Sequence, residues 1–274
     1  METRPKLAVI LAGGLARRMD GAQKPLLALG GRRLIDHVVD RARAQNLDVV
    51  VNLHAVTPEV AAPFAGLPLI ADAIPGHAGP LAGILAALDY AEGFGSVLSL
   101  PCDTPFLPDD LADRLSEAAR KTRDGLACAA SGGRVHPVVG LWPVSLRENL
   151  RRALVEGVRG VGQFQRRFDC ATVEWPTKPR NPFMNVNTPE DLAQAEALLA
   201  PKILDLRGLK CPLPVLKTRK VLAEMAPGER VEVSCTDPMS FVDVPHLVRE
   251  TGNVLEAQSR AEGVAVFLIR RQVR

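Results

Sequence analysis

One stretch near the start of the chain, Leu11 to Leu26 (LAGGLARRMDGAQKPL), most constrains the fold. It follows a continuous apolar run, Lys6 to Ala12, that is typical of a buried parallel strand. Its glycines allow a ligand to approach the backbone closely, and Arg17, Arg18 and Lys24 add positive charge. A strand that leads into such a loop is suited to bind a polyphosphate.

Strand and helix patterns alternate after this loop. Apolar residues at helical spacing predict a helix over 34–44, and a β-branched run predicts a strand over 48–52, which together complete a βαβ unit. Further strands are predicted at 69–71, 96–100, 126–131 and 138–142, and further helices at 79–91 and 108–123. We therefore expect an α/β fold with a doubly wound, mostly parallel sheet.

Polar residues follow several of these strands. In a doubly wound sheet the ligand lies outside the carboxyl ends of the strands, where we expect the loop, Asn52, Asp72 and Asp103 to meet. The loop contains neither G-x-G-x-x-G nor G-x-x-x-x-G-K-[ST], so it is neither a Rossmann nor a P-loop fingerprint. The sequence therefore predicts a different kind of nucleotide-binding loop.

Composition excludes several classes of function. The net charge is +3, with basic and acidic residues interleaved, which argues against a nucleic-acid partner. The five cysteines form no CxxC pair, so neither a disulfide framework nor a zinc ribbon is indicated. No apolar run approaches the roughly 20 residues of a membrane span, and we expect a soluble, cytoplasmic protein without a membrane partner.

The pattern of strands and helices restarts after Ala200-Pro201. The order βαβαββ predicts a two-layer α/β sandwich, and we place the two domains at 1–200 and 201–274. Pro212 at the first helical position would put Cys211 at a helix N-cap, where the helix dipole and Lys210 favour the thiolate and lower its pKa. Cys211 is thus a candidate nucleophile, with a structural capping cysteine as the alternative.

The motifs of the first domain resemble those of a known enzyme family. LAGGLARRMDGAQK, GPLAG from Gly79, PCDTPFLP from Pro101, the His136-Pro137 pair and NVNTPEDL from Asn185 are similar to the MobA-type molybdenum cofactor guanylyltransferases, over about residues 6–199. The resemblance implies a Rossmann-like nucleotidyltransferase fold. It also implies transfer of GMP from GTP to the phosphate of molybdopterin, with Mg²⁺ as cofactor and release of pyrophosphate.

The resemblance also implies roles for individual residues. Arg18 and Lys24 would hold the triphosphate, Asp103 would bind Mg²⁺, and Asn187, or Asn185 as second choice, would lie near the metal and phosphates. The GTP contacts would be Leu11, Ala12, Gly13, Gly14, Lys24, Asn52, Asp72 and Asp103. Asp20 departs from the family pattern, which has glycine there, and we expect it to face solvent or to pair with Arg17.

Structural alternatives exist for three of these residues. Lys24 on a generic loop would be a solvated charge, and Asp103 would be a helix N-cap. Asn187 precedes Thr188 and Asp191, which form a capping box, so it would simply belong to a helix start. We favour the functional interpretation for Lys24 and Asp103, whereas both interpretations stay open for Asn187.

His136 and the remaining cysteines are interpreted as structural. His136 precedes a proline, which is more typical of a structural than of a catalytic position. Cys102, Cys128 and Cys170 are predicted to be small core or loop residues, and Cys235 a packing residue at a strand end.

The second domain resembles the TusA/SirA-type sulfur carriers. The segment LDLRGLKCPLPVLKTRKVL and the TDP at Thr236 carry this resemblance, over about residues 203–269. It implies that Cys211 holds a persulfide, taken from a donor such as a cysteine desulfurase. The presence of both domains on one chain leads us to expect molybdoenzyme maturation proteins as further partners. Alternatives to GMP transfer also stay open. They are cytidylyl transfer to the same cofactor, which the LAGG sequence disfavours, transfer to an unrelated sugar-phosphate or pterin acceptor, and a non-catalytic cofactor-binding protein that delivers sulfur.

Overall fold

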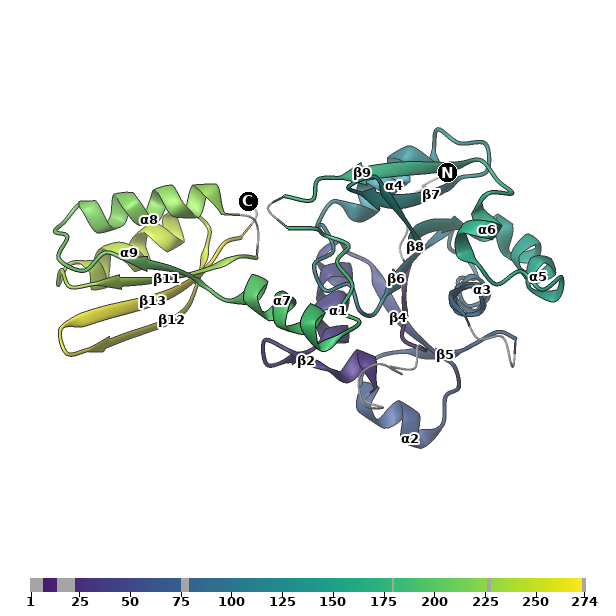
Figure 1. Cartoon of the computed structure of the whole chain (residues 1–274), viewed down its shortest axis with the longest axis horizontal. Helices are drawn as coiled ribbons and strands as arrows, with labels where there is room; N and C mark the ends of the chain where they lie inside the picture. The colour runs from purple at the N-terminus through teal and green to yellow at the C-terminus, as the bar shows by residue number, and fades with distance from the viewer. Residues whose placement is uncertain (1–6, 14–22, 75–78, 179, 226–227, 273–274) are drawn as a thin grey trace. The chain divides into compact units, whose positions relative to one another are not determined.

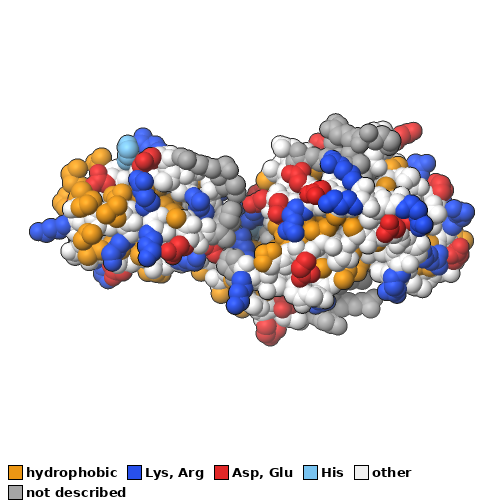
Figure 2. Space-filling view, turned by 90° about the horizontal axis from the view of Figure 1, so that it is seen from above, with side chains coloured by type: hydrophobic (Ala, Val, Ile, Leu, Met, Phe, Trp, Pro, Cys, Tyr) orange, Lys and Arg blue, Asp and Glu red, His pale blue; other side chains and the backbone are white. Residues whose placement is uncertain are grey.

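The computed structural model describes residues 7–13, 23–74, 79–178, 180–225 and 228–272. The chain forms two compact units, Met1–Gln194 and Ala195–Arg274. The domain boundary between residues 200 and 201 stays a prediction. No helix among the described residues is long and apolar enough to cross a membrane. Figure 2 shows acidic and basic side chains interspersed on the visible face of each unit, in keeping with the small net charge of +3.

The first unit is built on a seven-stranded sheet of order β5-β4-β1-β6-β8-β7-β9. Its strands are β1 (Leu7–Leu11), β4 (Asp48–Leu53), β5 (Leu69–Ala71), β6 (Ser96–Pro101), β7 (Leu126–Ser131), β8 (Arg134–Pro143) and β9 (Cys170–Trp175). Only β8 runs antiparallel to its neighbours β6 and β7, so the predicted mostly parallel sheet is confirmed. A small hairpin of β2 (Ala28–Leu29) and β3 (Arg32–Arg33) lies outside this sheet.

Helices cover both faces of this sheet (Figure 1). On one face lie α1 (Leu34–Ala44) and α4 (Leu111–Ala119), and on the other α3 (Pro80–Tyr90), α5 (Arg147–Val155) and α6 (Val161–Gln165). Shorter elements are η1 (Lys24–Leu26), α2 (Pro58–Ala61), η2 (Ala62–Phe64) and η3 (Val144–Leu146), and α7 (Pro189–Leu199) follows the last strand.

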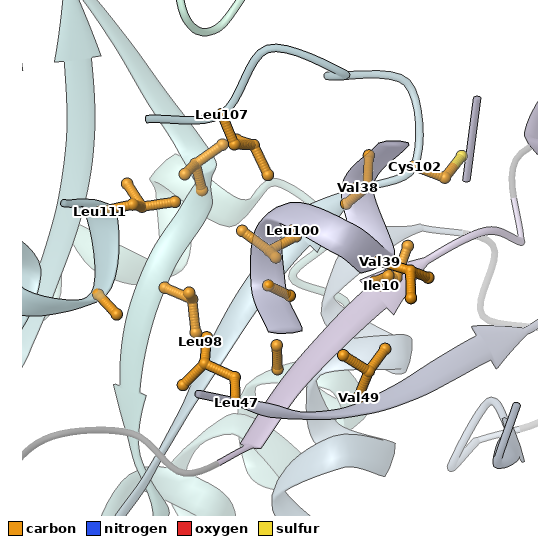
Figure 3. Close-up of a cluster of buried hydrophobic side chains, with 14 of the residues drawn as sticks. Ile10, Val38, Val39, Leu47, Val49, Leu98, Leu100, Cys102, Leu107 and Leu111 are labelled. Carbon is orange, nitrogen blue, oxygen red and sulfur yellow. The ribbon is translucent and has the colours of Figure 1, made fainter. Parts of the chain in front are cut away.

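Side-chain alternation along β1 explains the two cores. Ala8 and Ile10 face the α1 and α4 side, whereas Leu7 and Val9 face the α3 and α5 side. Figure 3 shows the first core, in which Ile10 and Leu100 pack with Val38 and Val39 of α1. Burial on both faces is why β1 consists entirely of apolar residues.

The second unit is a four-stranded sheet of order β10-β11-β13-β12, and α8 and α9 cover one face of it (Figure 1). Its elements are β10 (Lys202–Asp205), α8 (Leu213–Glu224), β11 (Arg230–Cys235), α9 (Ser240–Glu250), β12 (Val254–Ala261) and β13 (Val264–Arg270). Only β10 and β11 pair in parallel. The predicted βαβαββ order and two-layer sandwich are confirmed.

Within the first unit, the predicted elements differ most from the structure after β7. β8 begins at Arg134 rather than at residue 138 and returns antiparallel to β7. A two-residue turn of Gly132 and Gly133, with φ of 57° and 74°, makes this return possible, because glycine adopts positive φ without strain. β9 and the helices α5 and α6 are elements that the sequence patterns did not predict.

Candidate active site

The register of the parallel strands assembles the candidate site. Leu11, the last residue of β1, pairs with Asn52 of β4 on one side and with Pro101 of β6 on the other. Asp72 follows β5, which pairs with the end of β4, and Asp103 follows β6 by two residues. The carboxyl ends of these four strands therefore bring the predicted polar residues to one edge, as the sequence analysis expected.

Asn52 and Asp72 form the first polar cluster at this edge. Asn52 is buried, and its Nδ2 donates to Asp72 Oδ1 over 3.1 Å. Asp72 Oδ2 accepts from Nδ1 of His54, 3.0 Å away, so both carboxylate oxygens are oriented by neighbours. Gly83 in α3 lies directly against Asn52: a Cβ added there would lie 2.1 Å from Asn52 Oδ1. The Asn52 side chain fits at this position because Gly83, on the facing helix α3, has no side chain.

Lys24, Asp103 and Asn187 form the second cluster. The Lys24 ammonium group donates to both Asp103 Oδ2 and Asn187 Oδ1. The Lys24 and Asp103 side chains are largely buried, at 14% and 12% exposure, so the pair is shielded from solvent. The neighbouring Thr104 hydroxyl donates to Asn185 Oδ1 over 3.2 Å, which brings the second predicted asparagine to the same place.

The structure tests two of the structural alternatives. No helix begins at Asp103, because α4 starts at Leu111, so the capping interpretation of Asp103 is excluded. The capping box at α7 is real: the Asp191 N–H donates to Thr188 Oγ1, and the Thr188 N–H donates to Asp191 Oδ2. Asp191 Oδ2 also accepts from the Asn187 N–H, over 2.9 Å. The cap uses only the backbone of Asn187, whose side chain remains available to contact Lys24.

A cavity of about 840 Å³ connects the two clusters. Of the predicted residues, Leu11, Gly13, Lys24, Asn52, Asp72, Asp103 and Asn185 line it. Ala12 and Asn187 lie beside it, Ala12 through an N–H that donates to Asn52 O and Asn187 through Lys24. Gly14, Arg17, Arg18 and Asp20 lie outside the described residues, so their predictions stay untested.

Two parts of the cavity wall were missed by the sequence analysis. His54 lines it two residues after Asn52, and residues 134–139 of β8 also line it. The signal for His54 was its position just after a strand end. The sequence signal for β8 is the His136-Pro137 pair, for which a structural role is predicted above.

Cys211 lies in the second unit, in surroundings that differ from the prediction. The cap of α8 is Pro212 and the helix begins at Leu213, so Cys211 precedes the cap instead of forming it. Its side chain is exposed, and its N–H donates to Asp237 Oδ2 over 2.7 Å. Desolvation and the hydrogen bond and charge of Asp243, together with the charge of Asp237, raise the pKa of the Cys211 thiol. The predicted lowering of this pKa is wrong, because desolvation and the carboxylates of Asp243 and Asp237 both disfavour the thiolate.

Comparisons with known proteins agree with both motif sets. Residues 8–171 match the MobA-like NTP transferase domain family, and residues 202–271 match the sulfurtransferase TusA family. The chain is 50% identical over 197 residues to a molybdenum cofactor guanylyltransferase of Bradyrhizobium sp. (strain ORS 278), with 70% of this chain and 92% of that protein covered.

Two further relatives extend this result. A molybdenum cofactor guanylyltransferase of Rhodopseudomonas palustris (strain BisB5) is 47% identical, over 70% of this chain and 92% of its own length. The crystal structure of molybdopterin-guanine dinucleotide biosynthesis protein A from Archaeoglobus fulgidus superimposes with a TM-score of 0.59 at 26% identity, covering 70% of this chain and 97% of that one. Together with the geometry of the cavity, these similarities show that the chain belongs to the molybdenum cofactor guanylyltransferases, a family of MobA-like nucleotidyltransferases, and that it carries a TusA domain in addition.

Proposed function

We propose that the first unit transfers GMP from GTP to the phosphate of molybdopterin, and that the TusA domain carries a persulfide on Cys211. The main support for the proposed GMP transfer is that two separate polar clusters lie at one cavity. Asn52 and Asp72 form a neutral-to-acidic end, and Lys24, Asp103 and Asn187 form an end with a paired cation. A nucleoside triphosphate has the same two-part chemistry.

The Asn52–Asp72 end suits guanine. A carboxylate accepts hydrogen bonds from the N1–H and the exocyclic amine of guanine, two donors on one edge that cytosine does not offer. The Asn52 amide and the His54 ring hold both oxygens of Asp72 in place before the nucleotide arrives. Such preorganisation reduces the cost of ordering the site on binding.

The Lys24–Asp103 end suits phosphate and a divalent cation. Asp103 Oδ2 and Asn187 Oδ1 both already contact a cationic group, the Lys24 ammonium, and oxygen ligands of this kind are those that Mg²⁺ prefers. The part of the chain that the structure describes contains no group of three or more His, Cys, Asp or Glu side chains placed to hold a metal. A Mg²⁺ ion that takes its other ligands from substrate phosphates and water requires only one protein carboxylate.

Different residues have different roles in the proposed transfer reaction. Lys24 binds oxygens of the triphosphate and stabilises the departing pyrophosphate, and Arg18 is proposed to share this role. Asp103 would hold Mg²⁺, which supplies charge neutralisation at the phosphate oxygens. The cofactor phosphate attacks the α-phosphorus of GTP directly, so the protein contributes mainly positioning and no covalent enzyme intermediate forms.

Cys211 is proposed to carry the sulfur. Its thiolate attacks the outer sulfur of a donor persulfide, a new S–S bond forms at Cys211, and the donor leaves as a thiolate. The exposed position of Cys211 supports this exchange, which requires access for a second protein. We propose a cysteine desulfurase as donor and molybdoenzyme maturation proteins as recipients.

Separate variants test the two halves. Asp103→Ala is expected to abolish nucleotide transfer and leave persulfide loading by a cysteine desulfurase intact, as measured by the mass of the protein. Cys211→Ser is expected to do the reverse. Asp48→Ala, at the opposite end of β4, serves as the matched control because Asp48 is exposed and remote from the cavity. Full transfer by Asp103→Ala would refute the proposed metal site, and a wild-type protein that loads sulfur but transfers no nucleotide would establish the non-catalytic alternative.

A further inference from the structure

One wall of the cavity has no role in binding GTP as described above. It is the first half of β8, which continues past the end of β6: β8 pairs with β6 only from Gly140 to Pro143. Its register with β7 also shifts, because Cys128 pairs with Gly140 but the next residue, Ala129, pairs with His136. The three residues between His136 and Gly140 therefore form a bulge, and bulges of this kind often re-aim side chains beside active sites.

Buried polar side chains fix this bulge from behind. Gln165 Nε2 donates to Pro137 O over 3.0 Å, and Ser99 Oγ donates to Val138 O over 2.5 Å. Ser99 is fully buried and Gln165 is 5% exposed. With these carbonyls satisfied, the segment that carries His136 is held in one position.

The hydrogen bonds around His136 determine its tautomer. Ser131 Oγ donates its single hydrogen to Asn181 Oδ1 over 2.9 Å, and Asn181 is oriented by the Phe183 N–H, which donates to the same oxygen. His136 Nε2 lies 2.9 Å from Ser131 Oγ. Because the hydroxyl hydrogen is already used, Nε2 must be the donor, so the neutral ring carries its hydrogen on Nε2 and Nδ1 is an acceptor.

The environment keeps this ring neutral and fixed. Burial, together with the positive charge of Arg134, lowers the pKa of His136, against a smaller opposing effect of Glu174. The ring packs on Phe183 at a centroid distance of 4.9 Å. The described residues provide no hydrogen-bond partner for Nδ1, although His136 lines the cavity. Such an acceptor is available to a ligand.

The strand order indicates which ligand this is. In the order β5-β4-β1-β6-β8, the guanine end lies at β5 and β4, Asp103 follows β6, and His136 lies on β8. His136 is thus on the far side of Asp103 from Asn52 and Asp72. A second substrate whose phosphate meets GTP at Asp103 would extend its other end toward His136.

We propose that His136 is a specificity-determining residue of the acceptor subsite, whose Nδ1 accepts a hydrogen bond from an N–H of the pterin ring system. Pterins carry ring N–H and amine donors on their edges, which a neutral acceptor in a preformed wall recognises. This inference rests on the proposed function, since it requires molybdopterin as acceptor. Protonation of His136 would place a hydrogen on Nδ1 and convert the acceptor into a donor.

Two matched variants test the assignment. His136→Gln keeps a donor near the Nε2 position for Ser131 but removes the Nδ1 acceptor, whereas His136→Asn keeps an oxygen near the Nδ1 position and loses the contact with Ser131. We expect the KM for molybdopterin to rise about 3- to 10-fold in His136→Gln, the loss of one neutral hydrogen bond, with the KM for GTP unchanged. His136→Asn should retain most acceptor affinity. If His136 had only a structural role, His136→Asn would raise the KM for molybdopterin more than His136→Gln.

The pH dependence provides a second readout. The wild-type KM for molybdopterin should rise on acidification through the lowered pKa of His136, and His136→Asn should lack this rise. An unchanged acceptor KM in His136→Gln, in an assay where the wild type is active, overturns the role of His136 and leaves the proposed function standing. A wild type that binds GTP in calorimetry but never guanylates molybdopterin overturns both.

Discussion

Gly83→Ala is a small change with a large expected effect on nucleotide binding. A Cβ at this position would lie 2.1 Å from Oδ1 and 2.7 Å from Cγ of Asn52, distances that real Cβ contacts do not show. Asn52 has little room to move aside, because it is 3% exposed and its Nδ2 donates to Asp72 Oδ1. The variant must therefore displace the Asn52 side chain from its bond with Asp72.

The size of the effect follows from the bonds that are lost. Loss of one hydrogen bond and exposure of an unsatisfied buried partner cost about 1–3 kcal/mol. If this cost appears in GTP binding, Kd rises roughly 5- to 150-fold, since 1.4 kcal/mol is tenfold. Overpacking of a buried site also costs about 1–3 kcal/mol of unfolding free energy, which lowers Tm without preventing folding.

Titration calorimetry with GTP and thermal unfolding measure both effects. Asn52→Ala should weaken GTP binding to a similar extent. The double variant Gly83→Ala/Asn52→Ala should bind no more weakly than Asn52→Ala and should regain part of the lost Tm, because the clash with Asn52 is removed and only the 2.8 Å approach to the end of the Leu11 side chain remains. Gly162→Ala in α6 is the matched control, since its added Cβ would approach no atom closer than 3.6 Å. Wild-type GTP affinity in Gly83→Ala, or additive losses in the double variant, would refute the reasoning.

Two further predictions concern charge. Asp243→Asn should increase the rate of Cys211 alkylation by iodoacetamide near pH 8 several-fold, because removal of this carboxylate lowers the raised pKa of the thiol and increases its thiolate fraction. Glu224→Gln is the control. An unchanged alkylation rate in Asp243→Asn would rule out Asp243 as a cause of the raised pKa. Lys24→Met should strengthen Mn²⁺ binding in the absence of nucleotide, because it frees the Asp103 carboxylate from its ammonium partner. Electron paramagnetic resonance measures this binding. Weaker Mn²⁺ binding would show that Asp103 is not the ligand.

The site residues at strand ends were predictable because their positions depend on local pattern. Apolar runs mark where each parallel strand ends, and the register of such strands then brings Asn52, Asp72 and Asp103 to one edge. The same reasoning gave the βαβαββ order of the second unit. Both results follow from strand periodicity and turn residues, which act over a few positions.

The missed features depend on contacts between distant segments. The bulge that presents His136 is fixed by Ser99 and Gln165, and no local pattern specifies that pairing. Likewise, the sequence around Cys211 suggested a thiol with a lowered pKa, but desolvation in the folded unit, together with Asp243 from α9 and Asp237, raises that pKa. Local sequence indicated where the candidate site residues lie, whereas the electrostatic surroundings of those residues depend on tertiary contacts.

The most direct test of the central claim is a transfer assay with two nucleotides. The protein is incubated with Mg²⁺ and molybdenum-loaded molybdopterin together with either GTP or CTP, and the nucleotide attached to the cofactor is identified by mass spectrometry. The arrangement of Asn52 and Asp72 predicts attachment of GMP with release of pyrophosphate, and no attachment of CMP. Attachment of CMP alone would contradict it.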